Sequence, residues 1–168
     1  MPISMYQASV PVFQKMLKNL DGILDKAAAS AESRKFDPAV LLNARLAPDM
    51  YPFTRQVQIA TDHAKGGPAR LAGLEPPKFE DNESSFGEIK ARVARVQCYL
   101  ATLTPAQIDG SEERKIVLKF GPREFEFVGL PYLTQFALPN FYFHYTTAYA
   151  ILRHNGVPIG KTDFLGGR

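Results

Sequence analysis

The sequence predicts an all-α protein, an up-down-down-up four-helix bundle with a small β-hairpin before the last long helix. Apolar residues recur every three or four positions in the segments 4–31, 53–66, 85–103 and 130–155, which is the spacing of amphipathic helices. A proline-rich segment separates the second helix from the third, and strict alternation marks the hairpin. With 168 residues and 45% hydrophobic composition, the chain can bury one sizeable core, so we expect a single domain, 1–168.

A capping box marks the start of the first helix, because Ser4 precedes Gln7 by three positions. We expect this helix to run to about Ala31 and to bend at Pro11, which has no backbone N–H. Its apolar seam is typical of a bundle helix and comprises Tyr6, Val10, Phe13, Leu17, Leu20, Leu24 and Ala27.

A short helix and the second long helix follow. Asp37-Pro38 pairs a good N-cap with proline at the first helical position, which predicts a short helix through about Leu46. The second long helix begins near Phe53. We expect it to end, or at least to break, at Gly66-Gly67-Pro68, because glycine and proline both disfavour a helix interior.

The segment from Gly73 to Asn82 is rich in proline and acidic residues, so it is predicted to be extended. An extended segment of that length spans roughly 30 Å, which equals the length of a helix of about 20 residues. The chain can therefore return to the end of the bundle where the second helix began. This makes the second and third long helices parallel.

The third long helix starts at a second capping box, formed by Ser85 and Glu88. We interpret its basic residues, Lys90, Arg92 and Arg95, as a solvated helix face. Its apolar seam is the most regular in the chain and comprises Phe86, Ile89, Val93, Val96, Leu100 and Leu103.

Apolar and charged residues alternate over 115–120 and again over 124–127, on either side of a turn at Gly121-Pro122. This pattern predicts a β-hairpin. An isolated hairpin is marginally stable in water, so its apolar face must pack on the bundle.

The final helix, from Leu130 to Asn155, is aromatic on most of its faces, which is typical of a central or interfacial helix. One face is interrupted by the polar residues Asn140 and His144, and this interruption is the best candidate for a site. Pro139 is expected to kink the helix just before Asn140. Residues 157–168 are expected to form a tail, either loose or ordered against a second subunit.

Composition and charge argue against several classes of protein. The formal net charge is +3, and the 20 basic and 17 acidic residues are interspersed, so no stripe of positive charge predicts nucleic-acid binding. The sequence contains no run of 18 or more apolar residues, so it does not predict a membrane span. The N-terminus does not have the pattern of a signal peptide. The single cysteine, Cys98, cannot form an internal disulfide, which fits a cytoplasmic protein.

The chain resembles the DinB/YfiT-like four-helix bundles, a superfamily that includes metalloenzymes, and within it a bacterial family known only as a domain of unknown function. The segments that carry the resemblance are RLAPDMYPFTRQVQIA from Arg45, AKGGPARLAG from Ala64, FALPNFYFH from Phe136 and AYAILRHNGVPIGK from Ala148. With the first helix they cover nearly the whole chain. The resemblance implies the bundle fold and a site between its second and fourth long helices.

The resemblance also implies a set of metal ligands. In typical metal-binding members, one histidine comes from the second long helix and two, four residues apart, come from the fourth, and His63 and His144 occupy two of these positions. The third position is Ala148, which cannot bind a metal. Other donors could complete a zinc, nickel or iron site, and the candidates are Asn140, Asp62 and Asp49.

Two functions follow from these observations. One is a non-catalytic homodimer, whose aromatic helix faces and hairpin form an interface or a small-molecule pocket and whose histidine and asparagine only satisfy buried hydrogen bonds. It needs no cofactor. The other is an enzyme in which one divalent metal ion activates water or a low-molecular-weight thiol, an activity that the resemblance implies for some relatives.

Overall fold

Four long helices, α1 (Val10–Ser33), α3 (Phe53–Leu71), α4 (Phe86–Ala101) and α7 (Leu138–His154), form the bundle. The structure is a computed structural model that describes residues 2–167, apart from the side chain of Phe120. The shorter elements are α2 (Ala39–Leu42), α5 (Pro105–Ile108), β1 (Lys115–Phe120), β2 (Arg123–Val128), α6 (Gly129–Pro131), the π-helix η1 (Tyr132–Ala137) and α8 (Lys161–Leu165). Within the described residues, no helix combines the length and hydropathy that crossing a membrane requires.

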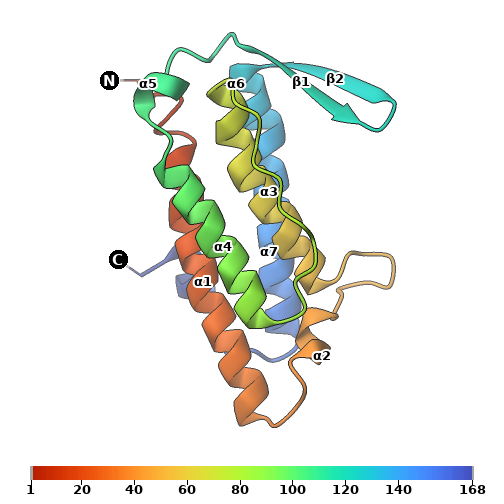
Figure 1. Cartoon of the computed structure of the whole chain (residues 1–168). Helices are drawn as coiled ribbons and strands as arrows, with labels where there is room; N and C mark the ends of the chain where they lie inside the picture. Colours follow the sequence, from red (N-terminus) through yellow and green to blue (C-terminus); the bar gives the residue numbers. More distant parts are fainter. Residues whose placement is uncertain (1, 168) are drawn as a thin grey trace.

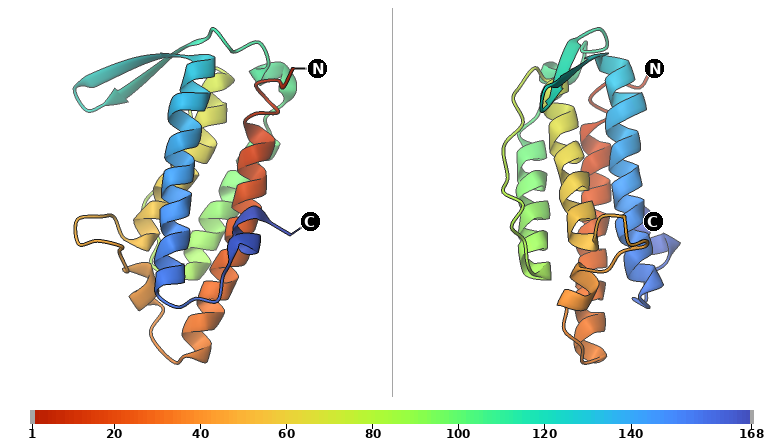
Figure 2. Two further views of the ribbon diagram at one scale, coloured as in Figure 1. Left: turned by 180° about the vertical axis from the view of Figure 1, so that it is seen from behind. Right: turned by 90° about the vertical axis from the view of Figure 1, so that its right-hand side faces the viewer.

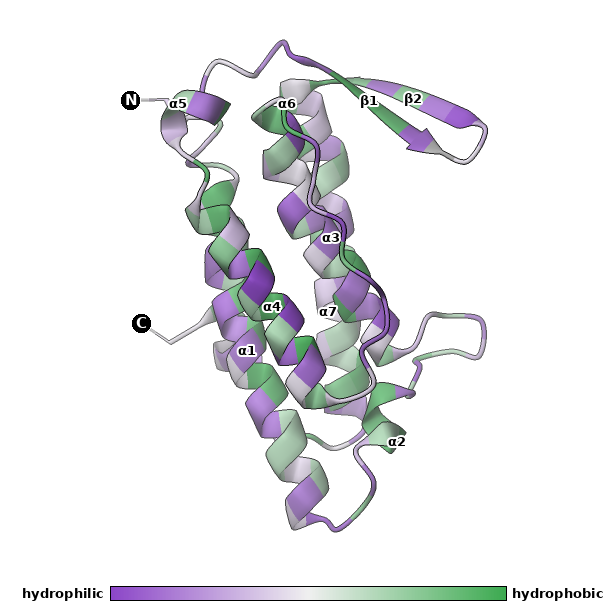
Figure 3. Ribbon diagram, viewed as in Figure 1, coloured by the Kyte–Doolittle hydropathy of each residue, from purple (hydrophilic) through white to green (hydrophobic). Residues whose placement is uncertain are grey.

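The predicted topology is confirmed. Helices α3 and α4 run parallel to each other and antiparallel to α1 and α7 (Figures 1 and 2). The segment between α3 and α4 is extended and follows the length of the bundle, as its composition predicted. Figure 3 shows that this linker is mainly hydrophilic, whereas hydrophobic and hydrophilic residues alternate along both strands of the hairpin.

Helix α1 begins six residues later than predicted, at Val10 instead of Ser4. The capping box does form, because Ser4 Oγ accepts from the Gln7 backbone N–H at 3.3 Å and Gln7 Oε1 accepts from the Ser4 N–H at 3.2 Å. The residues after it form turns, and regular helix starts only next to Pro11. Proline has no N–H to donate, so it is accommodated in the first helical turn, where that donor would have no partner.

Helix α3 continues through Gly66-Gly67-Pro68 to Leu71, so the predicted break is wrong. Gly67 allows neighbouring segments to pack closely against α3. A Cβ at Gly67 would lie 3.4 Å from the Ala137 Cβ and 3.5 Å from the Phe13 ring. Burial of this segment between α1 and η1 outweighs its low helix propensity.

The linker is fixed to the bundle by Arg92 of α4, which has 0% solvent exposure. Its Nη1 donates to the backbone carbonyl of Glu80 at 3.0 Å and to the Glu83 carboxylate at 3.1 Å, and it lies 3.0 Å from the Asp81 carboxylate. On the α3 side, Nε donates to Thr61 Oγ1 at 2.7 Å. The interpretation of Arg92 as part of a solvated face is therefore wrong.

Phe79, also in the linker, completes this anchor. Its ring lies beneath three cationic groups, with centroid distances of 5.3 Å to Lys65, 5.7 Å to Arg92 and 4.6 Å to Arg95. Cation–π contacts of this kind stabilise a partly buried aromatic ring. The linker thus packs against α3 and α4 along its acidic half.

The hairpin forms as predicted, with Ile116 paired to Phe127 and Leu118 to Phe125. Ile116 and Leu118 are buried, so one face of the hairpin covers the end of the bundle. The chain then turns at Gly129, where a Cβ would lie only 1.9 Å from the Ser111 carbonyl oxygen. Only glycine fits this close approach.

The last long helix is helical without a gap from Gly129 to His154, as predicted, but its hydrogen-bonding pattern changes along its length, through α6, η1 and α7. The π-helix η1 precedes Pro139, which occupies the first turn of α7 and cannot donate to a carbonyl of the preceding turn. A π-helical turn thus precedes the proline, and the kink just before Asn140 stays a prediction. The change of hydrogen-bonding pattern lies next to the candidate site, as π-helical turns often do.

The C-terminal segment is ordered on its own chain instead of forming a loose tail. Helix α8 lies against α1, where Asn19 Nδ2 donates to the Phe164 carbonyl at 3.0 Å and Lys26 pairs with Asp163 at 2.7 Å. The Phe164 ring packs edge-on against Tyr145 of α7 at 4.9 Å.

We predict that Arg92→Met lowers the free energy of unfolding by about 3–5 kcal/mol, because it leaves the buried Glu83 carboxylate without its main cationic partner. Urea unfolding followed by circular dichroism measures the loss. Arg95→Met is the matched control: Arg95 contacts the same carboxylate at 3.7 Å, but 54% of its side chain is exposed, so the expected loss is below about 1 kcal/mol. Equal losses in the two variants would contradict the anchoring role of Arg92.

Candidate functional site

A cleft of about 520 Å³ lies beside α3, beneath the hairpin and next to η1. It is large enough for a small organic molecule. Polar and apolar side chains share its lining, which comprises Tyr51, Arg55, Ile59, Asp62, His63, Lys65, Gly66, Arg70, Pro76, Leu118, Tyr132 and Phe136.

His63 of α3 and His144 of α7 face each other across the interface between these helices. Their ring centroids are 6.3 Å apart and the rings are nearly parallel, at 10°. The Phe136 ring covers His63 from η1, with a centroid distance of 5.7 Å. The two histidines that the sequence singled out therefore lie together and half-buried, with His63 lining the cleft and His144 next to it.

A fixed hydrogen bond sets the tautomer of His144. Gln56 Nε2 donates to the Tyr51 carbonyl at 3.1 Å, which turns Gln56 Oε1 toward the imidazole. His144 Nδ1 donates to this oxygen at 2.7 Å. The Nε2 of neutral His144 is therefore left without its proton and can accept a hydrogen bond or bind a metal ion.

Both imidazoles are held in the neutral form. The pKa of His63 is lowered from 6.5 to about 4, mainly by burial and next by the nearby His144, whereas Asp62 acts in the opposite direction. Burial, and next the positive charge of Arg55, lower the pKa of His144. Near pH 7 the pair presents two uncharged rings.

The other three predicted ligands are engaged elsewhere or lie apart. Asn140 Nδ2 donates to the Phe136 carbonyl at 2.7 Å, within its own helical turn. The Asp62 carboxylate accepts from Lys65 and from Arg92, each at 2.8 Å. Asp49 is exposed in the loop before α3 and makes no contact with either histidine in the described part of the chain.

These positions test whether the residues fit the metal implied by the resemblance. Two imidazoles converge, but no three His, Cys, Asp or Glu side chains among residues 2–167 lie close enough to share an ion. The buried Ala148 replaces the third histidine. A catalytic zinc site ordinarily has three protein ligands, so the described side chains supply only part of such a site.

Arg70 is a functional candidate that the sequence reasoning missed. Its Nη1 donates to the Tyr132 hydroxyl at 3.3 Å, and no carboxylate of the described residues forms an ion pair with it. The guanidinium lies over Gly66, one helical turn earlier, where an added Cβ would come within 2.5 Å of Nη1. The spacing of Gly66 and Arg70 is visible in the sequence, but the interpretation of Gly66 as a helix end hides its meaning.

The other cations of the cleft have carboxylate partners. Lys65 pairs with Asp62 at 2.8 Å, and Arg55 pairs with Asp81 of the linker. Arg70 thus contributes an uncompensated positive charge a short distance from His63, whose pKa it helps to lower. The arrangement can hold an anion against a cation and a neutral imidazole.

The shifted pKa of His63 predicts a pH-dependent stability. Between pH 6.5 and about 4 the unfolded chain protonates His63 and the folded chain does not, so the free energy of unfolding falls as the pH falls through this window. We expect this residue to contribute about 2 kcal/mol of the loss, less than full linkage gives because the ring keeps partial solvent contact. Unfolding by urea at several pH values should show a correspondingly smaller fall for His63→Gln than for the original protein. His154→Gln, at the exposed end of α7, is the control, and identical curves for His63→Gln and the original protein would contradict the assignment.

Comparisons with known proteins agree with this fold. The family described as "Domain of unknown function (DUF1993)" matches residues 5–165. The crystal structure of a DinB family member protein from Shewanella denitrificans is similar, with a TM-score of 0.89 and 45% sequence identity, over 97% of this chain and 92% of that chain. No curated protein matches the sequence. The chain therefore belongs to the DUF1993 family of domains of unknown function and has the fold of a DinB family protein.

Proposed function

We propose that this protein is a non-catalytic homodimer that binds a small organic acid in the His63 cleft. The observation that carries this proposal is Arg70, a cation that lines a cleft of about 520 Å³ without a carboxylate partner in the described residues. A guanidinium in a partly apolar cleft binds a carboxylate by charge-assisted hydrogen bonds.

The neighbours of Arg70 support an anionic ligand. His63 supplies a neutral imidazole that can donate a hydrogen bond without a competing charge. Tyr132 holds the guanidinium through its hydroxyl, and burial raises the pKa of that phenol, so it stays protonated. A bound carboxylate would therefore meet donors on more than one side.

The same geometry favours binding over acid–base catalysis. An effective general base needs a pKa near the working pH, and a pKa of about 4 makes His63 a weak base. His144 is held by the uncharged amide of Gln56. No carboxylate hydrogen-bonds to either ring in the described structure, and the charge of Asp62 raises the pKa of His63 less than burial lowers it.

The outer face of α7 supports the homodimer. Phe143 is 58% exposed and Leu46 is 42% exposed, although both are large and apolar. They border a shallow cavity of about 510 Å³ whose remaining lining is Pro139, Tyr142, Thr146, Thr147 and Ala150. An exposed patch of this composition is typical of an interface.

We predict that small monocarboxylates, with butyrate as the probe, bind one site per chain and that Arg70→Gln weakens binding by about tenfold or more. Isothermal titration calorimetry measures the affinity. Gly66→Ala provides a second test, because its Cβ would displace the guanidinium while the alanine raises helix propensity. It should weaken binding without lowering the stability of the fold.

Arg153→Gln is the control, since this arginine lies at the exposed end of α7. Binding that survives both Arg70→Gln and Gly66→Ala, or no binding at all, would overturn the proposal. Light scattering on the same samples gives the molar mass, and a mass equal to the 18.7 kDa chain would rule out the homodimer.

A divalent metal ion is the second candidate ligand, and with it an enzyme that activates water or a low-molecular-weight thiol. It is favoured by the facing, neutral rings of His63 and His144 at 6.3 Å, because neutral imidazole is the form that binds metals. If this candidate holds, protein purified without an affinity tag contains near one equivalent of zinc, nickel or iron, and both His63→Ala and His144→Ala lose it. Elemental analysis decides the question, and metal-free samples throughout would exclude the candidate.

A further inference from the structure

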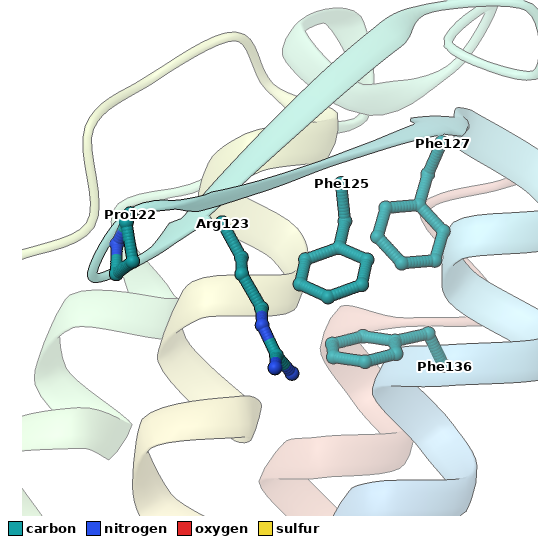
Figure 4. A pocket seen from close by; sticks show the side chains of 5 residues that line it. All are labelled: Pro122, Arg123, Phe125, Phe127 and Phe136. Carbon is teal, nitrogen blue, oxygen red and sulfur yellow. The ribbon is translucent and has the colours of Figure 1, made fainter.

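A second cavity, of about 490 Å³, lies under the hairpin and is lined by three phenylalanines together with Pro122 and Arg123. Figure 4 shows Phe125 and Phe127 projecting from β2 toward Phe136 of η1, with the Arg123 guanidinium extended beside the rings. Pro122 lines the end of the cavity at the turn of the hairpin. We call this cavity the hairpin pocket.

The alternation of the strands explains why these side chains share one face. Arg123, Phe125 and Phe127 are two residues apart along β2, and Phe125 is paired with the buried Leu118 of β1. Side chains at this spacing point to the same side of a sheet. The face of the hairpin that covers the bundle is therefore the face that lines the pocket.

The hairpin pocket and the His63 cleft are neighbours. Phe136 lines both of them, and Leu118, paired with Phe125, lines the cleft. One face of the hairpin thus covers the two cavities, and the Phe136 ring is their common wall.

Tyr132 connects the cation of the cleft to the rings of the pocket. Its hydroxyl accepts from Arg70, while its ring contacts Phe127 at 5.7 Å and Phe136 at 5.9 Å between centroids. Arg70 therefore lies one aromatic side chain away from the pocket. A ligand bound to Arg70 through one end can place its other end among the phenylalanines.

We infer that the ligand is an arylalkanoic acid, whose carboxylate pairs with Arg70 in the cleft and whose aromatic ring occupies the hairpin pocket. This inference rests on the proposed function and specifies the class of its ligand. The alkyl chain passes Phe136 and separates the charge from the ring.

The composition of the pocket selects an aromatic group. Phe127 and Phe136 already pack at 5.0 Å with their planes tilted by 45°, which leaves ring faces and edges for a further ring. A pair of packed aromatic rings is stabilised by more than the burial of its apolar surface alone. Arg123 has no ion pair in the described structure, and its planar guanidinium can stack on a ligand ring.

The test is a series of acids in which the carboxylate is separated from the ring by a lengthening chain: benzoate, phenylacetate, phenylpropionate and phenylbutyrate. Titration calorimetry should show the affinity rising along the series. We expect the best member to bind about tenfold or more tightly than butyrate, because the phenyl group adds buried apolar surface. The neutral alcohol phenylpropanol should bind more weakly than phenylpropionate.

Two variants test whether the aromatic ring of the ligand occupies the hairpin pocket. Phe125→Ala and Arg123→Gln should each weaken the best arylalkanoate, the former by about tenfold, and leave butyrate unchanged. Both side chains are exposed, so the fold tolerates the changes. Val117→Ala, on the opposite face of the same hairpin and 38% exposed, is the matched control and should change neither affinity.

The outcomes separate the two proposals. If butyrate and the arylalkanoates bind equally and Phe125→Ala has no effect, the arylalkanoic acid is wrong and the Arg70 anion site stands. If the aromatic acids bind but Arg70→Gln leaves their affinity unchanged, both proposals fail. Absence of binding by every acid overturns the proposed function and the inference with it.

Discussion

The guanidinium of Arg92, fully buried between α3, α4 and the linker, determines how the halves of this bundle are joined. The linker covers the length of a helix without secondary structure of its own, so its position depends on side-chain contacts. Arg92 binds Glu80, Asp81 and Glu83 of the linker on one side and the Thr61 hydroxyl of α3 on the other. A buried cation needs several partners at once, and here those partners come from segments that must meet for α4 to lie parallel to α3.

The same cation shapes the electrostatics of the cleft. By holding the Asp62 carboxylate at 2.8 Å, Arg92 draws the acid next to His63 in sequence into the linker anchor. His63 is left without a carboxylate hydrogen bond, and burial keeps it neutral. Arg70 then remains as the cation of the cleft with no acidic partner in the described residues. A structural contact of Asp62, which lines the cleft, thus sets the charge that the cleft offers to a ligand.

Features that depend on local pattern were predictable from the sequence. The apolar seams located the long helices, the alternation around Gly121-Pro122 located the hairpin, and the length of the proline-rich segment indicated the parallel pair. The errors arose where tertiary packing overrides local preference. Gly66-Gly67-Pro68 stays helical because neighbouring helices bury it, and Arg92 is buried because its partners lie in a distant segment. At the site, His63 and His144 do face each other, whereas the place of Asp49 depends on a loop that has no periodic pattern.

The pairing of the helices has a consequence for how the chain folds as it is synthesised. Helix α3 makes its most extensive contacts with α7, the last of the four long helices, and the packing surface at Gly67 also requires Ala137. During translation, α1, α3 and α4 therefore emerge before the partner that covers the inner face of α3. Contacts between segments so far apart in sequence slow folding, because the long intervening loop must close first. Until α7 has been synthesised, the face of α3 that includes Gly67 lacks its main packing partner, and exposed apolar surface of this kind favours aggregation and chaperone binding.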